Sequence, residues 1–283
     1  MARAALCVGI NEFAHLPMAS WLNGCVNDAR DIAAALKRVG FTARSTTVLT
    51  DAEATKAAVL AQLTELTNRA RAGKLDHLVL SFSSHGTQIK DLDGDERDGV
   101  DEAFACYDIT QKGDQWDRDT VIVDDELHAQ FAGLPAGMLV EVLLDTCHSG
   151  TGLRDADMLQ GRRPRFLPPP TVKGLEVANR ARAKQGGEVR GLRELTRTVK
   201  GAARPVLFTA CRSDQVASDA HFGGRSNGAF TYFFLKSLGQ DGSLARSALL
   251  KSVSDLLRGD SFSQRAQLEA PAAAKKAPFG QTW

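Results

Sequence analysis

The chain has 283 residues, of which 43% are hydrophobic and 24% are charged, a composition typical of a globular domain with a sizeable core. Its formal net charge of +1 gives no indication of binding to nucleic acid or to a membrane surface. The five cysteines are dispersed, odd in number and never in a CxxC spacing, which argues against a disulfide scaffold or a zinc site. No apolar run approaches the roughly 18 residues of a membrane span, so we expect a cytoplasmic protein.

Short apolar runs alternate with helical patterns along the chain, which is typical of a mainly parallel sheet with helices on both faces. In chain order, the predicted elements are a strand over 6–10, a helix over 27–39, a strand over 46–49, a helix over 54–72, strands over 77–83, 138–144 and 206–209, and helices over 228–238 and 244–257. The predicted fold class is therefore α/β.

Residues 154–204 have a different character from the rest of the chain. They hold thirteen Lys or Arg against five Asp or Glu, and they include the run Pro168-Pro169-Pro170. A long, basic, proline-containing segment is typical of a mobile surface insert. We therefore expect 1–153 and 205–283 to form one domain that this insert interrupts. Two interpretations of the insert stay open: a solvated loop, or a segment that the protein's own active site cuts.

Two reactive side chains follow two of the predicted strands. His85 comes directly after the strand over 77–83, and Cys147 comes shortly after the strand over 138–144. Because the carboxyl ends of parallel strands share one rim of a sheet, we expect the two residues to meet there. The imidazole would take the thiol proton and later protonate the leaving amine. Gly86 follows His85, and the N–H groups of Gly86 and Cys147 are candidates to stabilise an oxyanion.

Structural roles are the alternative for each residue alone, since an isolated cysteine is usually a small buried hydrophobe. His148 is a second candidate for the base, because it is adjacent to Cys147. Neighbouring residues on an extended chain point in opposite directions, which favours His85.

Several sequence blocks around these residues resemble metacaspases, and the chain resembles their minimal, bacterial-type form. The blocks occur in the family's order: Ser83-Ser84-His85-Gly86-Thr87-Gln88, residues 91–102, residues 123–127, Asp145-Thr146-Cys147-His148-Ser149-Gly150, and, after the insert, residues 209–218 and 228–231. Ser84 departs from the family's usual glycine.

The resemblance implies a caspase-like fold and a cysteine endopeptidase with a Cys147–His85 dyad. It also implies protein or peptide substrates cut after Arg or Lys and a monomeric state. Because the insert over 154–204 is long and rich in these residues, we expect self-processing of a zymogen at one of its basic residues. Two other functions stay open: a catalytically silent scaffold that binds partners, and a peptidase of the same fold that selects a different residue before the scissile bond.

The resemblance also implies a pocket for the basic side chain, formed by Asp145 and Asp28 and lined by Cys25 and Ser83. A carboxylate is the expected partner, because a buried guanidinium needs a charged group that binds it bidentately. The alternatives are a turn residue for Asp145 and a helix-start carboxylate, favoured by the helix dipole, for Asp28.

Residues 91–102 contain seven carboxylates in twelve positions, and so many like charges repel unless they bind a cation or face basic groups. An EF-hand is not expected, because Glu96 occupies the position that requires glycine. The resemblance implies calcium activation, with the metal held by Asp98, Asp101, Asp124 and Asp125. The alternative is a solvated acidic loop.

Overall fold

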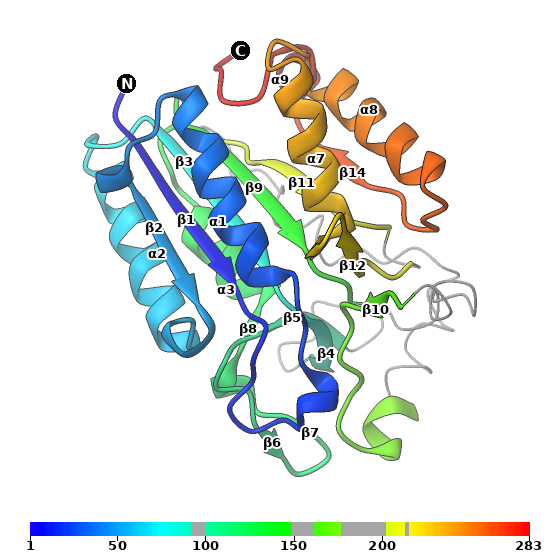
Figure 1. The fold of residues 1–283 in the computed structure, drawn as a ribbon. Coiled ribbons are helices and arrows are strands. Elements are labelled where there is room, and N and C mark those ends of the chain that lie inside the picture. The colour runs from blue at the N-terminus through cyan, green and yellow to red at the C-terminus, as the bar shows by residue number, and fades with distance from the viewer. Residues whose placement is uncertain (92–99, 149–160, 177–201, 213–214) are drawn as a thin grey trace.

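The computed structural model describes residues 1–91, 100–148, 161–176, 202–212 and 215–283. Its centre is a six-stranded sheet in the order β14-β11-β9-β3-β1-β2 (Figure 1). Five of these strands run parallel, and the edge strand β14 is antiparallel to β11. The strands span β1 Arg3–Gly9, β2 Thr46–Thr50, β3 His77–Ser83, β9 Leu139–Asp145, β11 Val206–Thr209 and β14 Gln267–Glu269.

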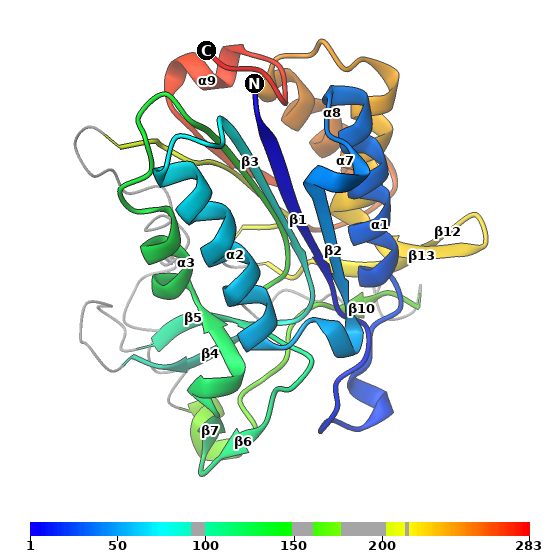
Figure 2. The ribbon, with the colours of Figure 1, turned by 90° about the vertical axis from the view of Figure 1, so that its left-hand side faces the viewer.

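Helices cover both faces of this sheet (Figure 2). One face packs against α1 (Cys25–Leu36), α7 (Ala229–Gln240) and α8 (Arg246–Gly259), and the other against α2 (Lys56–Arg71) and α3 (Asp124–Phe131). Successive residues of a strand point to opposite faces. Leu6 and Val8 of β1 therefore join the core under α2 and α3, whereas Ala5 and Cys7 join the core under α1, α7 and α8.

Smaller elements surround the carboxyl end of the sheet. Strands β4 (Gly86–Lys90), β5 (Val100–Ala105) and β8 (Val121–Val123) form an antiparallel sheet, and β10 (Arg163–Pro164), β12 (Ser218–Phe222) and β13 (Arg225–Gly228) form another. Other elements of the described residues include a short hairpin of β6 (Gln111–Lys112) and β7 (Gln115–Trp116), α9 (Ala272–Lys276), and 3-10 turns over Met18–Ser20, Lys37–Val39, Ala43–Ser45, Asp51–Glu53 and Arg118–Thr120.

The predicted fold class is confirmed, and all nine predicted elements occur with small shifts at their ends. The helix expected over 54–72 begins only at Lys56, because the Thr55 side chain caps it by accepting a hydrogen bond from the Ala58 N–H at 3.2 Å. The helix expected to extend to Val39 ends at Leu36 and continues as a 3-10 turn, which Gly40 closes with a φ of 91°.

Part of the predicted insert has a defined place in the fold. Residues 161–176 are described, and within them Arg162, Arg165 and Leu167 are buried. Residues 154–160 and 177–201 lie outside the described residues, so the prediction of a mobile segment there stays a prediction.

In the part of the chain that the structure describes, no helix combines the length and the apolar character that a bilayer crossing requires. No disulfide joins any of the five cysteines.

A buried ion cluster ties the C-terminal segment to the sheet. Glu141 of β9 lies 2.8 Å from the Arg246 guanidinium of α8 and 3.0 Å from Nε2 of His77 in β3, and all three side chains are fully buried. The Gly280 N–H also donates to Glu141, at 3.0 Å. The guanidinium is further held by the backbone carbonyls of Ala274, Ala277 and Gln281.

We expect Glu141→Gln to lower the free energy of unfolding by about 3–5 kcal/mol, because the buried Arg246 loses its charged partner. Urea unfolding followed by circular dichroism measures this change. Asp255→Asn is the matched control, since Asp255 pairs with Lys251 on the surface and such pairs contribute less than about 1 kcal/mol. Equal, small losses in the two variants would contradict the assigned role of the cluster.

Candidate active site

His85 lies in the connection between β3 and β4 and is almost fully buried. Its ring stacks on Phe13 with 5.3 Å between the ring centroids, and its Nε2 lies 2.7 Å from the Ser20 carbonyl oxygen. A carbonyl oxygen only accepts hydrogen bonds, so Nε2 carries the hydrogen. In the neutral ring, Nδ1 is then the nitrogen with a free lone pair, and it makes no hydrogen bond to a described residue.

The environment of His85 keeps its ring neutral. Burial is the largest influence and lowers the pKa of His85 to about 4, while the Ser20 carbonyl opposes this shift. The backbone of Arg165 is also close enough to favour the protonated ring. His85 is therefore neutral near pH 7 and able to take a proton at Nδ1.

Cys147 lies at the same rim of the sheet as His85. Strands β3 and β9 pair so that Ser83 is opposite Asp145, and both chains leave the sheet just beyond this pair. A side chain at Gly86 would collide with the backbone carbonyl of Cys147. The segment after β3 therefore packs directly on the segment after β9, and only glycine permits this approach.

The N–H groups of Gly86 and Cys147 converge on one oxygen atom, the backbone carbonyl oxygen of Arg165. The N···O distances are 2.9 Å from Gly86 and 3.2 Å from Cys147. Two backbone donors on one carbonyl oxygen form the arrangement that stabilises a tetrahedral oxyanion.

The segment around Arg165 runs past these two N–H groups as an extended strand. Arg163 and Pro164 pair antiparallel with β12, and the Arg165 N–H donates to the Ala217 carbonyl at 2.9 Å. Beyond Arg165, the Leu167 N–H donates to the Gly86 carbonyl, also at 2.9 Å. Such strand addition is a common way for a protein to bind a peptide.

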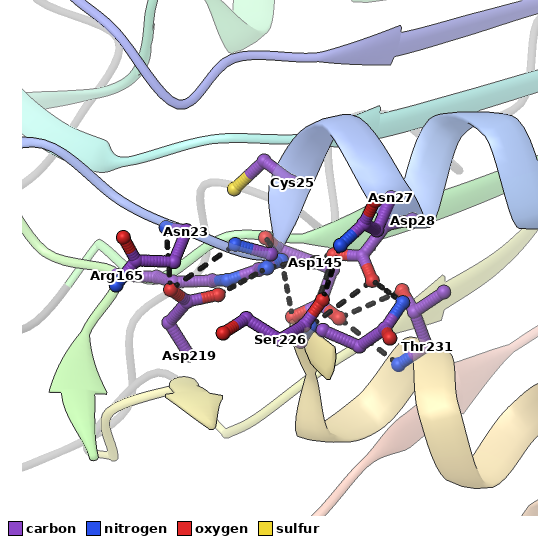
Figure 3. Close-up of polar contacts among 12 residues, drawn as sticks. Asn23, Cys25, Asn27, Asp28, Asp145, Arg165, Asp219, Ser226 and Thr231 are labelled. Atoms are coloured by element: carbon purple, nitrogen blue, oxygen red, sulfur yellow. Dashed lines mark hydrogen bonds and ion pairs between the residues drawn. The ribbon is translucent and has the colours of Figure 1, made fainter. Parts of the chain in front are cut away.

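The Arg165 side chain fills a buried pocket with three carboxylates (Figure 3). Its Nη2 lies 2.6 Å from Asp28 and 3.0 Å from Asp219, and its Nη1 lies 3.2 Å from Asp145. All four side chains are at most 2% exposed. The three carboxylates contact the guanidinium from several directions. This arrangement matches the planar fork of donors that arginine presents.

Backbone and side-chain donors hold each carboxylate in place. Asp145 accepts hydrogen bonds from the N–H and hydroxyl of Thr231 in the first turn of α7, where the helix dipole favours a negative charge. Burial raises the pKa of Asp28 to about 7, and Arg165 opposes this shift. The other donors are Asn227 and the Gly228 N–H for Asp28, and the N–H groups of Asn23 and Gly24 for Asp219.

The structure places the predicted pocket residues as follows. Asp28 and Asp145 both contact the Arg165 guanidinium. Cys25 is buried close by, and the charges of Arg165 and the pocket carboxylates act on its thiol, whose pKa is raised mainly by burial. Ser83 lies beside Asp145 in the sheet, and its buried hydroxyl makes no hydrogen bond to a described residue.

Asp219 is the pocket residue that sequence reasoning missed. It directly follows Ser218, the last residue of a block singled out in the sequence. The sequence feature that could have identified it is an acidic residue directly after this block, at the position where a short strand could pair with the basic segment.

His148 occupies a different environment from His85. Its ring packs edge-on against Phe104 with 4.8 Å between centroids, and its Nδ1 lies 3.3 Å from the Thr87 carbonyl oxygen. The Cys147 thiol donates to the Gln215 carbonyl at 2.7 Å.

Three of the four predicted calcium ligands are described, Asp101 on β5 and Asp124 and Asp125 on α3. Arg118 donates to one oxygen of Asp101 at 2.6 Å, while the other oxygen, Oδ1, is buried and accepts no hydrogen bond from a described residue. Burial, with smaller contributions from Asp91 and Asp125, raises the pKa of Asp101 to about 6. Asp124 and Asp125 begin α3.

Asp98 lies outside the described residues. Among those described, no three His, Cys, Asp or Glu side chains are arranged to hold a metal ion.

Comparison with known proteins identifies the family of this chain. The family model of the caspase domain matches residues 2–278. Among curated proteins, the chain is 30% identical over 295 residues to metacaspase-1 of Mycosarcoma maydis, covering 95% of this chain and 70% of that protein. The chain belongs to the metacaspase family. Metacaspase-1 of a Cryptococcus neoformans strain is 31% identical to this chain over 297 residues. The match covers 62% of the length of that protein.

Solved structures show the same fold. Protein GSU0716 from Geobacter sulfurreducens superposes with a TM-score of 0.67 and 28% identity, covering 100% of this chain and 99% of that one. Caspase-1 from Spodoptera frugiperda superposes with a TM-score of 0.58 and 14% identity, covering 94% and 85% of the two chains.

We expect Gly86→Ala in this metacaspase to reduce peptide cleavage by at least about 100-fold, because displacing Gly86 from Cys147 removes an oxyanion donor. The rate on an Arg-containing fluorogenic peptide measures the effect. Gly137→Ala is the matched control, since a side chain at Gly137 meets no atom within 4 Å. Similar rates in the two variants would show that the close approach of Gly86 is not needed.

Proposed function

We propose that this metacaspase is a cysteine endopeptidase that cuts after Arg or Lys, and that the bond between its own Arg165 and Phe166 is one of its substrates. One observation carries the proposal: the Arg165 guanidinium contacts three carboxylates while the Arg165 carbonyl oxygen accepts from Gly86 and Cys147. Side chain and scissile carbonyl are thus bound as a substrate requires.

The reaction begins when the Cys147 thiol leaves its hydrogen bond to the Gln215 carbonyl and gives its proton to Nδ1 of His85. The thiolate attacks the Arg165 carbonyl carbon, and the resulting oxyanion is held by the N–H groups of Gly86 and Cys147. As the carbon–nitrogen bond breaks, His85 protonates the amine of Phe166. Water, deprotonated by His85, then hydrolyses the thioester and restores the thiol.

The pocket explains the expected preference for a basic residue. A guanidinium reaches Asp28, Asp145 and Asp219 together through two nitrogens. The ammonium group of a lysine has a single nitrogen, which acts as one compact charge. We therefore expect Arg to be cut faster than Lys. An Asp at this position would bring a fourth carboxylate into the pocket and would be repelled.

The uncleaved chain has the properties of a zymogen. Its own segment fills the pocket, pairs with β12, and continues past Gly86 to Pro168, whose carbonyl accepts from the Trp116 ring N–H at 3.1 Å. An external substrate must compete with this tethered segment at high effective concentration. Cleavage after Arg165 would free the part of the cleft beyond the scissile bond.

We expect the purified wild-type chain to yield fragments of residues 1–165 and 166–283, measured by intact mass spectrometry. Cys147→Ala and Arg165→Gln should both stay uncut at this bond, because the first lacks the nucleophile and the second the cation. Arg163→Gln is the matched control and should still be cut, since the Arg163 side chain is exposed.

Peptides ending in Arg, Lys or Asp complete this experiment and separate the rival functions. Cys147-dependent cleavage of the Arg peptide supports the proposal. A silent scaffold would cut none of them, and a peptidase with another preference would cut the Asp peptide faster. An intact chain that still cuts Arg peptides would refute self-processing alone.

Calcium activation is a second proposal, supported by the buried Oδ1 of Asp101 and by the negative charges of Asp91 and Asp125, which act on Asp101. A bound cation would offset the repulsion among these carboxylates. We expect calcium at about 100 times its dissociation constant to raise the free energy of unfolding of Cys147→Ala by roughly 2.7 kcal/mol.

Asp101→Asn, added to the Cys147→Ala chain, should abolish this gain in thermal unfolding experiments with calcium or chelator. The exposed Asp119 provides the control Asp119→Asn, which should retain the gain. Identical melting with and without calcium in the parent chain would contradict the proposal. A monomeric state and a cytoplasmic location stay predictions.

A further inference from the structure

A second arginine of the bound segment is buried in its own site. Arg162, the fourth residue before the scissile bond, is 9% exposed. Its guanidinium carbon lies 3.6 Å from the centroid of the Phe262 ring. Its two terminal nitrogens donate to the carbonyls of Ser261 and Asp260, at 2.9 and 2.8 Å. One ring face and two carbonyl oxygens thus surround a single guanidinium.

The groups that form this site belong to parts of the fold outside the segment that occupies it. Helix α8 ends at Gly259, and its C-terminal end carries a partial negative charge that favours a cation. Ser261 has a φ of 62°, an uncommon conformation that turns the chain directly after the helix. Phe262 is itself buried and packs against Phe222 and Phe233, with 6.0 Å between ring centroids in both cases.

The chemistry of the site favours arginine over other side chains. A planar guanidinium stacks on an aromatic face while its edge nitrogens donate to two acceptors, and an ammonium group cannot do both. Arg163 shows the contrast within the same segment, because it is exposed and its terminal nitrogen donates to the carbonyl of Trp21 alone.

We propose that Phe262, with the carbonyls of Asp260 and Ser261, forms a specificity subsite for arginine at the fourth position before the scissile bond. The substrates are then extended segments with two arginines separated by two residues, as in Arg162-Arg163-Pro164-Arg165. This inference rests on the proposed peptidase activity and adds a second determinant to it. The alternative is that the Arg162 contacts only tether the chain's own segment.

The test compares two fluorogenic peptides, Arg-Arg-Pro-Arg and Ala-Arg-Pro-Arg, on the self-processed protein with both of its fragments present. In the wild type, we expect kcat/KM to be about tenfold higher for the peptide that begins with arginine, the ratio that a cation–π contact of about 1.4 kcal/mol produces. In Phe262→Leu, this ratio should fall to about one while cleavage of Ala-Arg-Pro-Arg persists.

Phe279→Leu is the matched control, because Phe279 is also buried but packs against Phe208 and Phe234 in the core; it should keep the tenfold ratio. Equal rates for the two peptides on the wild type would overturn the subsite while leaving the peptidase intact. Absence of cleavage of both peptides would instead refute the proposed function. A ratio that survives in Phe262→Leu would assign the preference to other residues.

Discussion

A desolvated arginine among three carboxylates is the interaction on which the organisation of this active site depends. Burying an isolated charge costs several kcal/mol, and only close counter-charges with good hydrogen bonds offset that cost. Asp28, Asp145 and Asp219 meet this requirement for Arg165. Without a cation, the three carboxylates would repel one another in a region closed to water. The pocket therefore favours a cation, which Arg165 of the protein itself supplies.

The parallel sheet supplies the rigid frame for this pocket. Asp145 ends β9, Asp28 lies on α1 and Asp219 on β12, so three distant parts of the chain must be fixed at once. The register that places Ser83 beside Asp145 also sets the His85 and Cys147 segments against each other. Asp145 of the pocket and the candidate dyad are thus positioned by the same two strands, and a shift of one strand would disturb both.

Much of this frame could be predicted from the sequence, because apolar runs and helical periodicity report burial directly. His85 and Cys147 were accessible for the same reason, since each follows a strand that the pattern identifies. The antiparallel sheet was not accessible: β5 carries Asp101 and Glu102 at buried positions, and such residues within an acidic run indicate a loop. The burial of β5 depends on packing against residues that are distant in the sequence, which the local sequence pattern does not identify.

The basic segment shows the same limit more sharply. Charge and proline content indicate a solvated insert, yet Arg162 and Arg165 are buried. Their partners lie far away in the sequence, at Asp28, Asp219 and Phe262. The composition of the segment shows that burying its charges would be costly. It does not show that distant residues supply the partners that offset this cost. The self-cleavage hypothesis named the segment, and only the fold identifies which of its arginines occupies the pocket.

The most direct test of this account is a crystal structure of the full-length Cys147→Ala protein, which keeps the backbone N–H at position 147 and cannot cut itself. The account predicts electron density for Arg165 within hydrogen-bonding distance of Asp28, Asp145 and Asp219, with its carbonyl oxygen between the N–H groups of residues 86 and 147. Density that places the Arg165 side chain in solvent, with the pocket filled by water or by another group, would contradict it.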